Sequence, residues 1–259
     1  MTTAIVLAGG SGSRMNSDKA KQYIEVGGVP LIVYSLRTFQ ESPVDSIVLV
    51  VREGDHEYVQ REIVERFGIS KVKSIVPGGK ERFDSVWAGI QAAVGNDIIL
   101  SETNDPAPSE DIIMIHDGAR PFVSHEMITG SIEAAGKYGA CTVAVPVKDT
   151  IKVVDKDGFG VDTPDRTTLY QVQTPQTFRA SVIIEAHKRF REDPRSGITD
   201  DTMLVEEYLK QRVYMVPGDY RNLKVTTPED IVLTEALGGK DIYSAPSLWM
   251  RSIRSRGAE

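Results

Sequence analysis

The stretch AIVLAGGSGSRM, residues 4–15, decides the fold, because an aliphatic run passes directly into a turn that contains three glycines. A short continuous aliphatic run is typical of a strand buried on both faces of a parallel sheet. A glycine-rich turn after such a strand exposes backbone N–H groups that bind anions. Arg14, Lys19 and Lys21 add positive charge beside the turn. We therefore expect a ligand that carries phosphate groups.

Two common phosphate-binding motifs do not match this turn. The Walker A motif needs Gly-Lys followed by Ser or Thr, and none of the Gly-Lys pairs in the sequence continues in that way. The dinucleotide motif G-x-G-x-x-G can start at Gly10 but lacks its third glycine, because Met15 stands there. The sequence thus argues against P-loop chemistry and against a nicotinamide cofactor.

Short aliphatic runs alternate with segments of helical periodicity through the first half of the chain. Further strands are expected at 46–51, 71–76, 111–115 and 140–146. Helix signals lie between them, including Ser124 as an N-cap and Gly139 as a C-terminal stop. This alternation predicts an α/β fold with a doubly wound, mostly parallel, Rossmann-like sheet.

The pattern changes after residue 146. Residues 147–172, with a turn signal at 155–158, are expected to form a protruding β-arm of the kind that often makes an oligomer contact. The later expectations are helices at 180–192 and 200–209, strands at 212–216 and 223–226, and a last helix that Thr227 caps and Gly238-Gly239 ends. We interpret residues 1–239 as one domain and 240–259 as a C-terminal tail of unknown role.

Composition and charge exclude several classes of protein. The chain has 259 residues, of which 41% are hydrophobic, and a net charge of −7, so we expect neither a disordered chain nor a partner made of nucleic acid. Cys141 is the single cysteine and lies in an apolar run, which predicts a buried thiol and excludes an internal disulfide. The sequence has no membrane-spanning run and no signal-peptide pattern, so we expect a cytoplasmic protein.

Several motifs together resemble a known family. The opening LAGGSGSRM followed by KQY resembles the signature of the nucleoside-diphosphate-sugar pyrophosphorylase and cytidylyltransferase superfamily. The narrower resemblance is to the 2-C-methyl-D-erythritol 4-phosphate cytidylyltransferases, through GGKERFDSV (78–86), HDGARP (116–121), PVKDT (146–150), QTPQ (173–176) and NLKVT (222–226). It implies transfer of CMP from CTP to 2-C-methyl-D-erythritol 4-phosphate, with release of pyrophosphate, in non-mevalonate isoprenoid biosynthesis.

The resemblance also implies roles for particular residues. Those it places around CTP are Ala8, Gly9, Gly10, Arg14, Lys21, Gly79, Arg82, Ser85 and Asp117. Among them Arg14 and Lys21 contact the triphosphate, and Gly79 and Ser85 read the cytosine. Arg120 and Thr174 have supporting roles.

The polyol phosphate acceptor is expected to meet Lys224 together with Thr150 and Arg166 from the arm of a second subunit. The resemblance therefore also implies a homodimer.

The residues themselves suit this chemistry. A phosphate monoester has a second pKa of about 6, so it attacks the α-phosphorus without a general base. The reaction needs cancellation of negative charge, which favours Arg14, Lys21 and Lys224 as catalytic residues. Mg²⁺ takes one or two carboxylates besides substrate phosphates, and Asp117 is the best protein candidate. His116 is expected to be structural rather than a base.

Some alternatives stay open at the level of sequence. The run 169–178 resembles the ribitol-5-phosphate cytidylyltransferases as much as it resembles the erythritol enzymes. Gly118-Ala119, in contrast, favours the erythritol enzymes. A nucleotide-binding module without activity is a further alternative. Arg14, Lys21 and Lys224 argue against it, because a protein that only binds need not keep charges that stabilise a transition state. Asp200 and Asp201 are interpreted as the start of a helix rather than a site. His56, His125 and His187 are interpreted as surface or cap positions.

Overall fold

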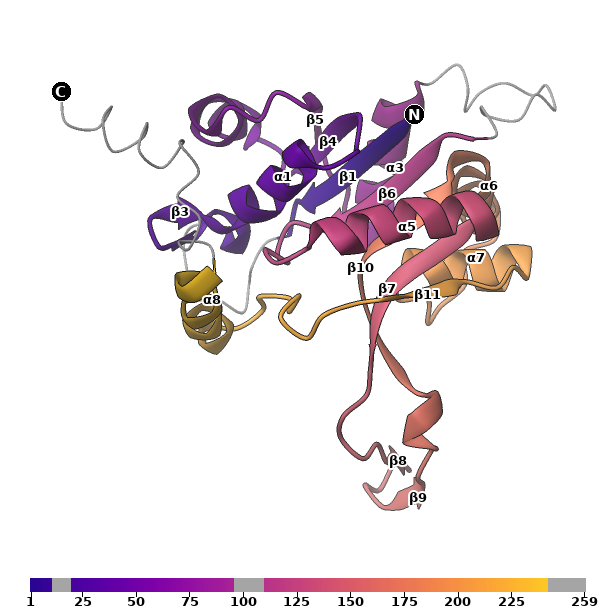
Figure 1. Cartoon of the computed structure of the whole chain (residues 1–259). Helices are drawn as coiled ribbons and strands as arrows, with labels where there is room; N and C mark the ends of the chain where they lie inside the picture. The colour runs from indigo at the N-terminus through magenta and orange to yellow at the C-terminus, as the bar shows by residue number, and fades with distance from the viewer. Residues whose placement is uncertain (11–19, 96–109, 242–259) are drawn as a thin grey trace.

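The computed structural model describes residues 1–10, 20–95 and 110–241, and these build one seven-stranded sheet in the order β11-β7-β10-β6-β1-β4-β5. The strands are β1 (Thr2–Ala8), β4 (Ser46–Val51), β5 (Val72–Pro77), β6 (Ile112–Asp117), β7 (Ala140–Pro146), β10 (Tyr170–Arg179) and β11 (Tyr214–Pro217). All neighbours are parallel except that β10 runs antiparallel to both β6 and β7. The expected mostly parallel sheet is confirmed (Figure 1).

Helices cover both faces of the sheet. They are α1 (Leu31–Glu41), α2 (His56–Tyr58) with a π-helical continuation (Val59–Glu65), α3 (Arg82–Val94), α5 (His125–Tyr138), α6 (Ala180–Glu192), α7 (Asp201–Leu209) and α8 (Pro228–Asp241). Neighbours in β1 point to opposite faces, so Val6 packs in a core with residues of α1 and α5, while Ile5 packs in a second core with residues of α3 and α6. The sheet is therefore doubly wound, as expected.

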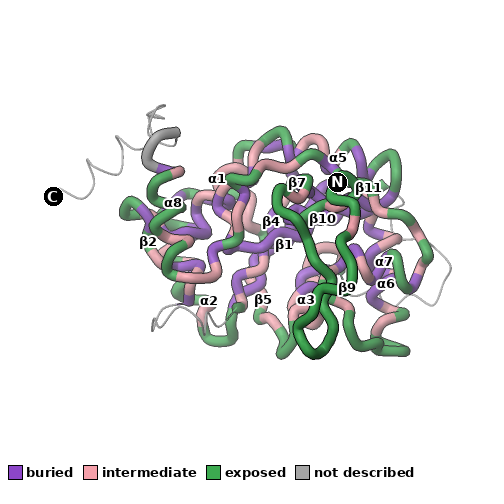
Figure 2. Tube along the Cα trace, turned by 90° about the horizontal axis from the view of Figure 1, so that it is seen from below, coloured by how far each residue is buried: buried purple, intermediate pink, exposed green. Residues whose placement is uncertain are grey.

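The predicted arm protrudes from this sheet. Strands β7 and β10 leave it together and end in the small pair β8 (Val153–Val154) and β9 (Gly160–Asp162), followed by a 3-10 turn (Arg166–Thr168) (Figure 1). Figure 2 shows the arm exposed along its length. Its tip exposes large apolar side chains, including Phe159 at 72% and Val161 at 61%. Such a surface is unusual for an isolated chain and marks an interaction region.

Two expectations near the C-terminus are wrong. Residues 223–226 form a loop rather than a strand, because Val225 N–H donates to the Ala119 carbonyl of a neighbouring loop instead of joining the sheet. Gly238-Gly239 do not end the last helix, which continues to Asp241, because both keep helical backbone instead of forming a left-handed cap. The boundary proposed at 239 therefore falls inside a helix.

Two features of the described residues concern the lone cysteine and the length of the helices. Cys141 is fully buried in β7, and burial raises the pKa of its thiol to about 12, so it is a packed strand residue and not a nucleophile. In the ranges 1–10, 20–95 and 110–241, none of the helices is long and apolar enough to cross a membrane.

Candidate active site

A cavity of about 380 Å³ lies at the carboxyl ends of β1 and β6 and the N-terminus of α3. Its position beside β1, between β4 and β6, is the switch point where ligands bind in doubly wound sheets. The residues that line it are Leu7, Gly9, Gly10, Lys21, Gly79, Lys80, Glu81, Arg82, Ser85, Asp117, Ala119 and Lys224. Eight of the residues selected from the sequence therefore meet in one cavity.

The first wall is the turn after β1, and Gln22 holds it. The buried amide of Gln22 donates to the carbonyl of Ala8 and, at 3.5 Å, to that of Gly10. KQY (21–23) belongs to the motif that resembles the superfamily signature, but no role was predicted for its glutamine. Lys21, beside it, lines the cavity. Arg14, predicted to contact the triphosphate, lies outside the described residues.

The second wall is the turn that leads into α3. Gly79 N–H donates to Ser85 Oγ at 3.2 Å, and this hydroxyl donates to the Glu81 carbonyl at 3.3 Å. A Cβ on Gly79 would collide with the side chain of Asp84, which completes a capping box with Glu81. Only glycine fits, so the turn holds the backbone of residue 79 against the cavity.

Asp117, the last residue of β6, is the centre of a charged cluster. Lys224 Nζ lies 2.8 Å from its Oδ2, and Arg120 Nε lies 3.8 Å from the same oxygen. Burial alone opposes ionisation of this carboxyl, but the positive charges of Lys224, Arg82 and Arg120 outweigh it and hold the pKa of Asp117 well below its usual range. Asp117 is therefore a carboxylate at neutral pH.

His116 is locked behind this cluster. Its Nε2 contacts the Arg120 carbonyl at 3.0 Å, which only accepts, so Nε2 carries the proton. Its Nδ1 lies 3.1 Å from Thr174 Oγ1, which in turn accepts from Asp117 N–H at 3.1 Å. Burial lowers the pKa of His116 to about 4. The histidine is thus neutral and fully engaged, which agrees with the structural role expected for it.

The loop that carries Lys224 is held from several sides. The buried Asn222 side chain donates to Gln173 Oε1 at 3.2 Å and to the Thr174 carbonyl at 2.9 Å. The backbone carbonyl of Asn222 accepts a hydrogen bond from Arg120 Nη1 at 2.7 Å. Residues 222–226 therefore act as an anchored loop that presents Lys224 to the cavity, although they form no strand.

Sequence reasoning missed one pair of functional interest. Asp201, set aside as the start of a helix, is fully buried and its Oδ2 lies 2.7 Å from Arg82 Nη1. His187, expected at the surface, is also fully buried and contacts Asp201 Oδ1 at 3.3 Å, so that expectation is wrong. Asp200 is the N-cap of α7, as expected. The sequence held no local signal that distinguishes the two acids.

Two predicted residues lie away from the cavity. Thr150 and Arg166 are exposed on the arm, where Arg166 Nη1 donates to the Lys148 carbonyl at 2.8 Å. Neither lines the cavity of its own chain.

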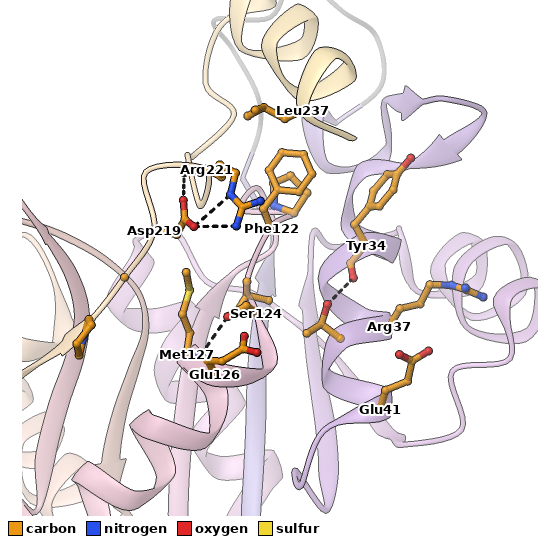
Figure 3. Close-up of a pocket in the computed structure, with 15 residues that line it drawn as sticks. Tyr34, Arg37, Glu41, Phe122, Ser124, Glu126, Met127, Asp219, Arg221 and Leu237 are labelled. Atoms are coloured by element: carbon orange, nitrogen blue, oxygen red, sulfur yellow. Dashed lines mark hydrogen bonds and ion pairs between the residues drawn. The ribbon is translucent and has the colours of Figure 1, made fainter. Parts of the chain in front are cut away.

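A larger cavity, of about 550 Å³, lies between α1, the start of α5 and the loop after β11. Figure 3 shows Tyr34, Arg37 and Glu41 along α1, with Asp219 and Arg221 across from them. Asp219 and Arg221 pair with each other at 2.9 Å. Because none of the selected residues lines this space, the smaller cavity is the candidate active site.

Comparisons with known proteins identify the family of the chain. The family model for IspD, 2-C-methyl-D-erythritol 4-phosphate cytidylyltransferase, matches residues 2–239. A protein of that name from Lachnospira eligens is 47% identical over 233 residues, which cover 89% of this chain and 96% of that protein. The chain belongs to the 2-C-methyl-D-erythritol 4-phosphate cytidylyltransferase family.

Further relatives support the same assignment. The cytidylyltransferase of Pelotomaculum thermopropionicum is 44% identical and covers 90% of this chain and 92% of its own length. Among solved structures, 4-diphosphocytidyl-2C-methyl-D-erythritol synthase from Anaerococcus prevotii has a TM-score of 0.75 at 30% identity, covering 92% of this chain and 98% of that one. The Thermus thermophilus cytidylyltransferase has a TM-score of 0.70 at 27% identity, covering 92% and 100%.

Family membership decides the class of reaction. The chain is an enzyme, a cytidylyltransferase that uses CTP and 2-C-methyl-D-erythritol 4-phosphate in isoprenoid biosynthesis. The relatives named above carry the erythritol acceptor in their names, which favours it over ribitol 5-phosphate. The alternative of a binding module without activity is set aside.

Proposed function

We propose that the phosphate of 2-C-methyl-D-erythritol 4-phosphate attacks the α-phosphorus of CTP in the cavity that Asp117 and Lys224 border. One observation carries the proposal. The Lys224–Asp117 ion pair at 2.8 Å shares a cavity with Gly9 and Gly10 and with the Gly79–Ser85 turn. Cations, backbone donors and a carboxylate that converge on one space are what transfer of a nucleotidyl group requires.

CTP would lie across the two turns. Its cytosine faces Gly79 and Ser85, with Arg82 at the same wall, and its ribose lies near Ala8, Gly9 and Gly10. Its triphosphate meets Lys21, whose side chain lines the cavity, and Arg14. This arrangement directs the α-phosphate toward Lys224.

The transfer balances without a general base. An oxygen of the acceptor phosphate forms a new bond to the α-phosphorus, the bridging bond between the α- and β-phosphates breaks, and pyrophosphate leaves with its electron pair. The acceptor is already largely ionised at neutral pH, since its second pKa is about 6. Lys224 and Lys21 stabilise the negative charge that accumulates on the α-phosphate and on the leaving group. The neutral, hydrogen-bonded His116 takes no part.

Mg²⁺, or another divalent cation, is the cofactor that fits these residues. The described residues contain no cluster of three or more protein ligands. Magnesium often uses one or two carboxylates, with waters and substrate phosphates completing its shell. Asp117 is ionised, and both of its ion pairs fall on Oδ2, so Oδ1 is the oxygen we assign to the metal. When bound, the ion would neutralise charge on the triphosphate.

The enzyme is proposed to work as a homodimer in the cytoplasm. Apolar side chains exposed at the tip of the arm, such as Val154, Phe159 and Val161, support burial against a second copy. In this dimer Thr150 and Arg166 would reach the acceptor in the opposite subunit. A cytoplasmic location is supported by the lone, buried Cys141, since extracellular chains more often carry disulfides.

The acceptor is tested by comparing two substrates in separate assays. The purified chain is incubated with CTP and Mg²⁺ and with either 2-C-methyl-D-erythritol 4-phosphate or ribitol 5-phosphate, and released pyrophosphate is measured. We expect rapid release with the first acceptor and at least about a hundredfold lower kcat/KM with the second, because a misfitting polyol leaves polar groups unpaired. Preferential turnover of ribitol 5-phosphate would contradict the proposal.

The arm is tested by mixing two impaired variants. Arg166→Ala leaves the cavity of its own subunit intact, and Lys224→Met leaves its own arm intact. If arms act across the dimer, co-refolded mixtures should recover up to about a quarter of wild-type activity, because half of the dimers are mixed and each has one complete site. Lack of recovery in mixtures shown to contain mixed dimers would mean that the arm does not complete the opposite site.

A further inference from the structure

Arg82 lines the candidate active-site cavity, and one nitrogen of its side chain already pairs with a carboxylate. It is the first residue of α3 and lines the cavity, yet its Nη1 lies 2.7 Å from Asp201 Oδ2. Asp201 is fully buried at the start of α7 and is not among the residues that line the cavity. Arg82 therefore borders the cavity and at the same time pairs with a desolvated carboxylate.

Asp201 is itself held in place. Its backbone N–H donates to Gln176 Oε1 at 3.1 Å, and its Oδ1 accepts from His187 Nε2 at 3.3 Å. His187 is fully buried and stacks on Trp87, with ring centroids 5.8 Å apart. A carboxylate fixed by several partners is a rigid anchor, so the arginine it binds loses most of its rotamer freedom before substrate arrives.

An anchor matters here because a second carboxylate competes for Arg82. The charges of Asp201 and Asp117 both stabilise the charged guanidinium. Asp117 is also the partner of Lys224 and the carboxylate we assign to the metal. If Arg82 moved toward Asp117, which lines the same cavity, it would neutralise a group that the reaction uses.

We propose that Asp201 is a positioning residue for CTP, which acts by holding Arg82 at the cavity wall, and that His187 supports Asp201 in this role. The inference rests on the proposed placement of CTP in this cavity. It extends that placement by making affinity for the nucleotide depend on a carboxylate that never touches it. Affinity for the polyol phosphate, which is assigned to Lys224 and the arm, should not depend on Asp201.

The test is a double-mutant cycle on CTP binding. Calorimetry measures the Kd for CTP of the wild type, Asp201→Asn, Arg82→Met and the double variant. We expect each single variant to bind CTP about tenfold more weakly and the double variant to bind no more weakly than Arg82→Met, because Asp201 acts only through Arg82. Steady-state kinetics should show a raised KM for CTP and a KM for the acceptor within about twofold of wild type.

A matched control separates positioning from folding. Asp200→Ala removes the neighbouring carboxylate, which caps α7 and contacts Gln176, but leaves the Arg82 pair intact. It should lower the melting temperature without changing the Kd for CTP. If Asp201→Asn does not fold, His187→Phe carries the test, since it keeps a stacking ring but removes the donor to Asp201, and it should weaken CTP binding severalfold.

The possible outcomes are distinguishable. Additive losses in the cycle, or unchanged CTP affinity in folded Asp201→Asn or His187→Phe, would overturn the positioning role while leaving the proposed function intact. Equal increases in the KM of both substrates would also overturn it, because they would indicate a general loss of structure. Failure of the wild type to bind CTP would overturn the proposed function and this inference together.

Discussion

Lys224→Met is expected to lower kcat about a thousandfold, the largest effect of any single change at this site. Lys224 borders the cavity at the end of an anchored loop, 2.8 Å from Asp117, where its ammonium can meet both the attacking phosphate and the α-phosphate. Methionine keeps the length of the side chain and its packing. The loss in kcat therefore measures how much the positive charge of Lys224 contributes as the pentacoordinate phosphorus forms.

The measurement is single-turnover pyrophosphate release at saturating CTP. Lys210→Met is the matched control, because Lys210 is exposed, follows α7 and pairs only with Glu207 at 3.4 Å among the described residues. Its activity should stay within about twofold of wild type. CTP affinity of Lys224→Met should fall much less than kcat. If both fell equally, Lys224 would merely hold the nucleotide.

Asp117→Asn is expected to lower kcat about a hundredfold or more and to raise the Mg²⁺ concentration needed for half-maximal activity. The substitution removes the ionised oxygen assigned to the metal and leaves Lys224 and Arg120 without their shared partner. It should also lower stability, because the charged neighbours remain. A Mg²⁺ titration of activity and a melting curve measure the two effects.

The pH dependence of that stability loss has a defined sign. The folded pKa of Asp117 lies below its ordinary value of 3.8, so its contribution to stability is complete above that value and declines as the pH falls below it. The difference in stability between wild type and Asp117→Asn should therefore shrink in acid. Asp219→Asn is the control for the Mg²⁺ requirement, since this carboxylate pairs with Arg221 beside the other cavity. An unchanged Mg²⁺ requirement in Asp117→Asn would contradict a metal at Asp117.

Most of the fold was predictable because its central strands, such as β1, β4 and β6, are buried on both faces. Runs such as 46–51 and 140–146 are continuous and apolar, and the structure places strands at those positions. The prediction from local pattern was wrong where contact with a loop distant in the sequence replaced pairing in the sheet. Residues 223–226 look like a strand, but Val225 bonds to the Ala119 carbonyl, so a tertiary contact took the N–H that a sheet would have used.

The candidate site was predictable to the extent that its residues lie in local motifs. The turn after β1, the Gly79 turn, Asp117 and Lys224 each carry a recognisable pattern, and all four meet in one cavity. Asp201 and His187 carry none. Next to Asp200, which caps a helix as its type suggests, Asp201 looked like a second helix-start acid, and His187 looked like one more polar residue on an amphipathic helix.

By itself the sequence determined the succession of buried strands, the glycine turns and the residue types that handle phosphate, because these depend on a residue and its near neighbours. Only the tertiary structure decided which charges pair. Arg82 meets Asp201, and Asp117 meets Lys224, because packing of α3 against α6 and of α6 against α7, and docking of the 222–226 loop, bring distant residues within 3 Å. Electrostatic energy depends on separation and burial, and neither is encoded in local pattern.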